Sequence, residues 1–184
     1  SHIVPRPFLV IATQNPIESE GTYNLPEAQL DRFMFKTIVG YPTQEEEARV
    51  LDIHSRQLDI NRVLTESIRQ VTTPEKIIEQ TKANAKVRVE SKLLNYINQI
   101  VRQTRSWPTF YMGASPRAGL AIVQGCRTLA AFHGRDYAVP DDVIEIAVPA
   151  LRHRVVLTAE AEVEGQKIDD ELTKLIRSIE VPRV

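Results

Sequence analysis

The chain has 184 residues, of which 26% are charged and 42% are apolar, and its formal net charge is −1. These values are typical of a globular protein with one domain, or one domain and part of another, and give no support for a general nucleic-acid or membrane-surface role. The sole cysteine, Cys126, excludes an intrachain disulfide and favours a reducing compartment such as the cytoplasm, and no apolar run approaches the roughly 20 residues that cross a bilayer.

The first predicted element is a strand over Phe8–Ala12, because this run is apolar throughout, as in strands buried on both faces. It ends in Thr-Gln-Asn-Pro at residues 13–16, where Pro16 cannot donate to a sheet and biases Asn15 towards extended backbone. Asn15 is therefore expected at the carboxyl end of a strand, where open α/β sheets bind ligands. The alternative is a turn-forming asparagine before proline.

A short helix or turn is predicted in the sequence L-P-E-A-Q-L-D-R-F, residues 25–33. Pro26 suits the first turn of a helix, and Glu27 suits its positive end. Apolar neighbours would anchor Arg32 and Asp31 firmly. The alternative for Arg32 is a surface ion pair with Asp31 or Glu27.

A second buried strand is predicted over Phe33–Val39, after which Gly40-Tyr41-Pro42 breaks the pattern. Thr43 and Glu46 then form a capping box, which marks a helix start. We therefore place a domain boundary at residues 41–43. Residues 1–41 are interpreted as the tail of an α/β nucleotide-binding domain, and residues 42–184 as a helical domain.

Helices are predicted over residues 44–59, 74–85, 91–104 and 116–133, from Pro140 onwards and from Asp169 to Pro182, with a short or irregular helix in 62–71 and an extended piece at 86–90. The helix over 44–59 is expected to turn five residues to the interior: Val50, Leu51, Ile53, His54 and Leu58. Spacing of three and four residues predicts an amphipathic helix after Ser91, with apolar positions Leu93, Leu94, Ile97, Ile100 and Val101.

The stretch G-A-S-P-R-A at residues 113–118 predicts a helix start with Ser115 as the N-cap and Pro116 in the first turn. Arg117 then lies in the first turn, where a cation opposes the helix dipole. An anion held jointly by Arg117 and the helix start would explain this placement. The alternative is a surface arginine paired with a nearby carboxylate.

The basic cluster Arg152-His153-Arg154 is open to two interpretations, a solvated face or a contact between subunits or domains. His153 and His54 have no cysteine or histidine companions at metal-binding spacing, so no metal site is assigned. The acidic pair Asp141-Asp142 is expected to complement the dipole of the helix that Pro140 opens.

The motifs A-T-Q-N-P (12–16), G-T-Y-N-L-P-E-A-Q-L-D-R-F (21–33) and G-A-S-P-R-A (113–118) together resemble the MoxR family of AAA+ ATPases, and the resemblance covers essentially the whole chain. It implies that Asn15 is sensor 1, which orders the attacking water, and that Arg117 is sensor 2, which contacts the γ-phosphate in its own subunit. It implies that Arg32 is an arginine finger acting in trans on a neighbour's ATP. It also implies Mg²⁺ and ATP as cofactors, a homo-oligomeric ring that is often hexameric, and a client protein or complex that is remodelled.

The sequence contains no G-x-x-x-x-G-K-[ST] phosphate-binding loop and no apolar strand ending in paired acids before Asn15. We therefore expect a mainly α fold, a helical AAA+ lid domain preceded by a truncated piece of an α/β core made of two strands and a helix. The chain is expected to be the C-terminal portion of a longer protein and not to hydrolyse ATP alone. A stand-alone helical protein-interaction module is the alternative, and nucleic-acid binding through Arg152 and Arg154 is disfavoured by the net charge.

Overall fold

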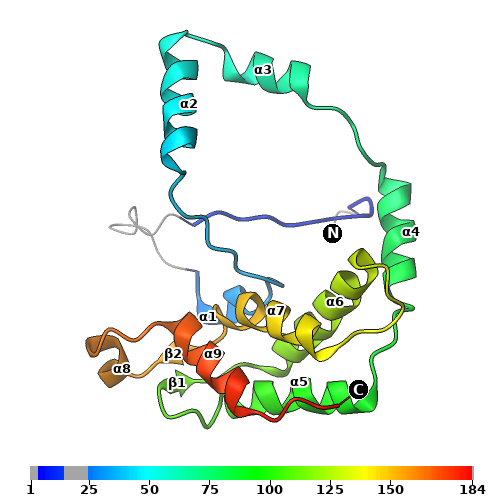
Figure 1. Ribbon diagram of the computed structural model, residues 1–184, viewed down its shortest axis with the longest axis vertical. Helices are drawn as coiled ribbons and strands as arrows, with labels where there is room; N and C mark the ends of the chain where they lie inside the picture. Colours follow the sequence, from blue (N-terminus) through cyan, green and yellow to red (C-terminus); the bar gives the residue numbers. More distant parts are fainter. Residues whose placement is uncertain (1–3, 15–24, 184) are drawn as a thin grey trace.

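Helices dominate the computed structural model, which describes residues 4–14 and 25–183 (Figure 1). The helices are α1 (Glu27–Leu30), α2 (Gln44–Ser55), α3 (Ile60–Ser67), α4 (Pro74–Asn84), α5 (Ser91–Gln103), α6 (Pro116–Phe132), α7 (Pro140–Leu151), α8 (Ala159–Val163) and α9 (Ile168–Ser178). Two short strands, β1 (Phe110–Met112) and β2 (Val156–Leu157), pair antiparallel. The predicted mainly α fold is confirmed. No helix of the described residues is long and apolar enough to cross a membrane.

Four helices, α5, α6, α7 and α9, form the helical core, in which α6 packs against both α5 and α7 and α9 packs against α5 and α7 (Figure 1). Their inward faces carry side chains with no exposed surface: Leu93, Ile100, Ile122, Cys126, Val143, Leu151, Leu172 and Leu175. Burying each large aliphatic side chain stabilises the fold by about 1.5–3 kcal/mol. Burial also raises the pKa of the Cys126 thiol to about 12, as expected for a structural cysteine.

Gly125 allows α6 and α7 to cross closely. A Cβ atom at this position would lie 2.6 Å from Cγ2 of Ile146 on α7 and 3.0 Å from Cζ of Phe35. Phe35 belongs to the predicted N-terminal domain, yet its ring packs against the helical core. The core therefore includes a side chain from the other side of the predicted boundary.

The predicted extended piece at residues 86–90 is confirmed in part: Arg88 bridges Tyr137 in parallel, whereas Lys86 and Val87 belong to the turn and bend that follow α4. The N–H of Arg88 donates to the Asp136 carbonyl at 2.8 Å, and the N–H of Ala138 donates to the Arg88 carbonyl at 2.9 Å. These bonds tie the segment before α5 to the connection between α6 and α7.

The two predicted N-terminal strands, Phe8–Ala12 and Phe33–Val39, are wrong. Neither range forms a strand among the described residues, and Leu9 and Ile11 are 78% and 81% exposed. A strand buried on both faces needs neighbours that take up its backbone N–H and C=O groups, and no described segment pairs with either range as a ladder. The helix or turn predicted in 25–33 is a single helical turn, α1.

The capping box that opens α2 is confirmed, since the N–H of Thr43 donates to Oε2 of Glu46 at 2.8 Å and the N–H of Glu46 donates to Oγ1 of Thr43 at 3.3 Å. The predicted interior face of this helix is wrong, because α2 has no buried residue and ends at Ser55. Figure 1 shows α2 and α3 lying apart from the helical core. Periodicity identifies the apolar face of a helix but not the surface that covers it.

Candidate functional site

The start of α6 is built as the sequence predicts. Ser115 has extended backbone, and its Oγ accepts a hydrogen bond from the N–H of Arg117 at 3.2 Å, while Pro116 occupies the first turn. This capping satisfies one of the free N–H groups at the helix start. Arg117 is therefore fixed in the first turn of a long helix, at its positive end.

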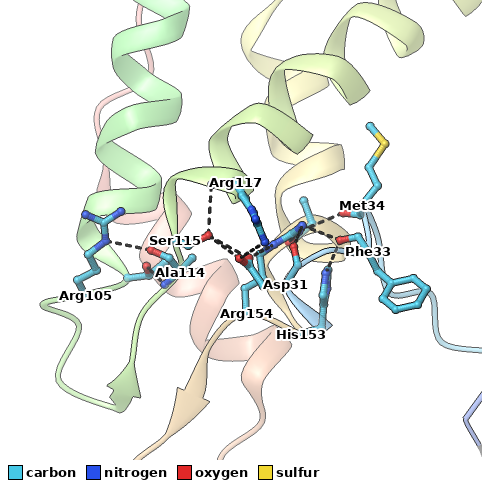
Figure 2. Close-up of polar contacts among 11 residues, drawn as sticks. Asp31, Phe33, Met34, Arg105, Ala114, Ser115, Arg117, His153 and Arg154 are labelled. Carbon is cyan, nitrogen blue, oxygen red and sulfur yellow. Dashed lines mark hydrogen bonds and ion pairs between the residues drawn. The ribbon is translucent and has the colours of Figure 1, made fainter. Parts of the chain in front are cut away.

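The loop before α6 is held against the end of α5. The fully buried Thr104 accepts a hydrogen bond from the N–H of Ala114 at 2.9 Å, and Nε of Arg105 donates to the Ala114 carbonyl at 2.9 Å (Figure 2). A Cβ on Gly113 would lie 2.6 Å from the backbone of Arg105, so only glycine permits this approach. The start of α6 is thus fixed against the end of α5.

The carboxylate of Asp31 lies at the start of α6 (Figure 2). The Ser115 hydroxyl donates to it at 2.9–3.0 Å, Nε of Arg154 donates to Oδ1 at 2.9 Å, and a guanidinium nitrogen of Arg117 lies 3.7 Å from Oδ2. An anion at the helix start, shared with Arg117, is the explanation that the sequence suggests for the placement of Arg117. In this structure that anion is a side chain of the chain itself, which corresponds to the surface-pair alternative for Arg117.

Arg154 is 5% exposed, and its donors are filled from the segment around Asp31. Besides the carboxylate, its guanidinium donates to the carbonyl of Asp31 at 3.0 Å, of Phe33 at 2.6 Å and of Met34 at 3.1 Å, and closely to that of Ala150 (Figure 2). Burial lowers the pKa of Arg154, and the bond to Asp31 opposes that shift. A guanidinium remains charged here because its ordinary pKa exceeds about 12.

His153 is buried beside Arg154, and Nε2 lies 3.0 Å from the Phe33 carbonyl. Burial lowers the pKa of His153, with the charges of Arg154 and Lys36 acting in the same direction, so the ring is neutral near pH 7. Since a carbonyl only accepts, Nε2 carries the proton. Nδ1 is buried without a hydrogen-bond partner among the described residues.

The segment around Asp31 is also fixed further along the chain, at Lys36. The N–H of Lys36 donates to the Pro149 carbonyl at 3.0 Å, and Arg152 donates to the Lys36 carbonyl at 3.2 Å while it also pairs with Asp169 at 2.8 Å. The solvated-face interpretation of the basic cluster is therefore wrong for His153 and Arg154. The cluster makes an internal contact across the predicted boundary.

The structure places the predicted site residues differently. Asn15 lies outside the described residues. Arg32 is exposed, and its side chain makes no hydrogen bond or ion pair with another described residue, so the predicted alternative of a pair with Asp31 or Glu27 is not observed. Arg117 has a 56% exposed side chain. The fold thus brings the turn that carries Arg32 beside the helix start that carries Arg117.

Sequence reasoning missed Asp31 and Arg154 as partners. They are 123 positions apart, and no local pattern connects residues at that distance. A weak signal existed, because the charged pair Asp31-Arg32 stands between apolar Leu30 and Phe33, and buried charges need paired partners. That signal indicates burial but not which cation supplies the pair.

The described residues fit part of an ATP site. The exposed Arg117 guanidinium and the positive end of α6 suit a phosphate, whereas the sequence has no loop that would cradle the triphosphate. Among the residues that the structure describes, no group of three or more His, Cys, Asp and Glu side chains could hold a metal ion. Arg117 and the start of α6 therefore present positive charge of the kind that suits a phosphate group.

Two family models match separate parts of the chain. Residues 1–35 match the family model of the ATPase family associated with various cellular activities (AAA), and residues 102–175 match the AAA lid domain. The chain is 38% identical over 192 residues to the chaperone MoxR1 of Mycobacterium tuberculosis, covering 98% of this chain and 48% of the relative. It is 39% identical over 176 residues to the uncharacterized protein YeaC of Bacillus subtilis, covering 96% of this chain and 53% of the relative.

A solved structure shares the fold over nearly the whole chain. The crystal structure of a candidate ATPase from Cytophaga hutchinsonii superimposes with a TM-score of 0.86 at 33% identity, covering 99% of this chain and 56% of that one. The chain spans about half the length of the curated relatives it matches.

Proposed function

Because the chain belongs to the MoxR-like AAA+ ATPases, we propose that it is part of an ATPase that couples hydrolysis of ATP to chaperone-like remodelling or maturation of a partner protein or complex. One observation carries the proposal. The exposed Arg117 stands in the first turn of α6 beside the turn that carries the exposed Arg32, and both turns lie in segments that match AAA family models.

The two guanidiniums have different proposed roles. Arg117 contacts the γ-phosphate of a nucleotide bound by its own subunit and so relates the position of the helical core to the state of that nucleotide. Arg32 reaches the nucleotide of a neighbouring subunit, where a guanidinium offers a bidentate fork to developing phosphoryl charge. Asn15, as sensor 1, orders the attacking water; this role is carried by the sequence motif alone.

ATP and Mg²⁺ are the proposed cofactors. When bound, Mg²⁺ neutralises charge on the phosphate oxygens during transfer to water. Asn15, Arg32 and Arg117 add an amide and two cations to that site, and they do not replace a phosphate cradle. We therefore propose that this chain by itself neither binds ATP tightly nor hydrolyses it.

An arginine finger acting in trans requires assembly. We propose a homo-oligomeric ring, hexameric as is frequent among AAA+ proteins, with a client protein or complex as the remodelled partner. A nucleic acid partner is not proposed, since the net charge is −1 and Arg154 is buried inside the chain.

Phosphate release from Mg-ATP tests the proposal. Protein expressed from the complete gene should turn over ATP, and Arg32→Ala should lower its rate by roughly 10³–10⁵-fold, the usual contribution of an arginine finger. The present chain alone should release no phosphate above background. Turnover by this chain alone at the rate of the protein from the complete gene would overturn the proposal.

A further inference from the structure

We infer that Asp31 is a positioning residue that, with Arg154, clamps the turn of residues 31–34 to the helical core, so that Arg32 moves as one body with the core of its own subunit. Residues 31–34 are called the Arg32 turn below. The inference rests on the proposed function, because it concerns how the arginine finger is held.

The clamp is costly to break because its cation is buried. The Arg154 side chain is 3% exposed, and it donates both to the Asp31 carboxylate and to backbone carbonyls on either side of Arg32. A planar guanidinium can satisfy these acceptors together, since its donors form a rigid fork. Removal of the carboxylate would leave a desolvated cation with an incomplete set of acceptors.

The turn is fixed on its C-terminal side as well. Phe35 packs at Gly125 of α6, and the N–H of Lys36 donates to the Pro149 carbonyl of α7. Between these anchors the side chain of Arg32 is exposed and makes no hydrogen bond or ion pair with the other described residues. A guanidinium held rigidly at its backbone and free at its tip is suited to reach a neighbouring subunit.

Arg117 is the weaker partner of Asp31. Its guanidinium lies 3.7 Å from Oδ2 and is 56% exposed, whereas Arg154 bonds Oδ1 at 2.9 Å. Arg117 can therefore leave Asp31 for a phosphate while the bonds of Arg154 and Ser115 keep the carboxylate in place. When Arg117 binds the nucleotide of its own subunit, the helical core would move. Arg32, which acts on the nucleotide of the neighbouring subunit, would move with it.

Steady-state ATPase kinetics of protein from the complete gene test the inference. Asp31→Asn should lower kcat by about 10–100-fold, the cost of misplacing a catalytic group by about 1 Å, while KM changes little. The double variant Asp31→Asn/Arg32→Ala should be no slower than Arg32→Ala, because both changes remove the same contribution. Asp52→Asn is the matched control, since Asp52 pairs with Arg56 on the exposed surface of α2.

Amide hydrogen exchange of the same proteins tests the clamp without catalysis. Peptides covering residues 29–37 should exchange at least ~10-fold faster in Asp31→Asn, and peptides from α9 should not change. Arg154→Lys serves if Asp31→Asn does not fold, because lysine keeps the charge but cannot span the carboxylate and the carbonyls. It should likewise lower kcat and speed exchange in residues 29–37.

Each outcome decides a separate point. If Arg32→Ala is as active as the wild type, the assignment of the arginine finger fails, and this inference fails with it. If Arg32→Ala is impaired while Asp31→Asn and Arg154→Lys match the wild type in kcat and exchange, the proposed function stands and the inference is overturned. The inference is also overturned if the losses of kcat caused by Asp31→Asn and Arg32→Ala multiply in the double variant, because Asp31 would then act independently of Arg32.

Discussion

A buried guanidinium destabilises a protein unless hydrogen-bond acceptors fill its donors. At the residue scale, Arg154 is such a group, and its hydrogen bonds determine how the site is arranged. It draws the Asp31 carboxylate and three carbonyls of residues 31–34 to one place. The two cations that contact Asp31 differ in what they would lose with its carboxylate. Arg154 would remain as a buried cation without its charged partner, whereas the exposed Arg117 would lose little.

Substitution Asp31→Ala should therefore lower the free energy of unfolding of this chain by roughly 3 kcal/mol, the cost of removing one member of a buried ion pair. Urea unfolding followed by circular dichroism measures it. Asp52→Ala, at an exposed pair with Arg56, should change the value by less than about 0.5 kcal/mol. Equal effects at the two sites would contradict the burial of the Arg154 pair.

The neutral, buried His153 predicts a pH dependence. Burial, reinforced by the charges of Arg154 and Lys36 and opposed by the Phe33 carbonyl and Asp31, holds its pKa below the ordinary value. As pH falls below about 6.5, the unfolded chain gains a proton at His153 that the folded chain does not take up, so stability is lost on acidification at about 1.4 kcal/mol per unit of pKa difference.

The variant His153→Gln removes this titration while its side-chain amide can still donate to the Phe33 carbonyl. Between about pH 7.5 and 5, the wild type should lose more unfolding free energy than the variant, as measured by urea unfolding at each pH. All other titratable groups are the same in both proteins. Parallel pH profiles would contradict the lowered pKa.

At the element scale, two glycines in α6 have opposite environments. The Cβ of a residue at 125 would lie 2.6 Å from Ile146, whose β-branched side chain is stiff, whereas at Gly119 the nearest atoms are 3.8 Å away on Val101. The crossing of α6 over α7 thus depends on the absence of one methyl group. The approach of α6 to α5 at Gly119 does not.

Gly125→Ala should lower the melting temperature, because overpacking of this kind costs about 1–3 kcal/mol. Gly119→Ala in the same helix should leave stability unchanged or raise it by up to about 1 kcal/mol, since alanine is the better helix former and fits the space. Thermal unfolding of both variants is the measurement. The reverse order would show that the two helices do not cross at Gly125.

At the scale of the whole molecule, apolar burial is concentrated in the helical core, while α2 and α3 carry exposed apolar side chains. Figure 1 shows these two helices lying apart from the helical core. Leu51 of α2 is 70% exposed, whereas Leu151 of α7 is fully buried. Apolar periodicity is present in both helices, so the difference lies in what covers each face.

The same substitution at both positions locates the core. Leu151→Ala should cost about 2–5 kcal/mol of unfolding free energy, as is usual for a large buried side chain. Leu51→Ala in this chain should change it by less than about 0.5 kcal/mol, as at an exposed site. Urea unfolding of the two variants decides, and a large loss at Leu51 would mean that α2 packs on another surface in solution.

The family resemblance and the starts of several helices could be predicted from the sequence. The capping box at Thr43 and Glu46, the N-cap at Ser115 and the first-turn place of Arg117 depend on residues within four positions of one another, and all three are confirmed. The roles of Asn15, Arg32 and Arg117 in hydrolysis stay predictions.

What tertiary structure alone decided is where distant residues meet. The strands predicted over Phe8–Ala12 and Phe33–Val39 failed because a strand exists only with partners, which local apolar runs do not specify. The pairing of Asp31 with Arg154 likewise arises from packing of α7 against the Arg32 turn. Sequence determines which groups need partners, since that need follows from their own chemistry, and the fold determines which partner lies within reach.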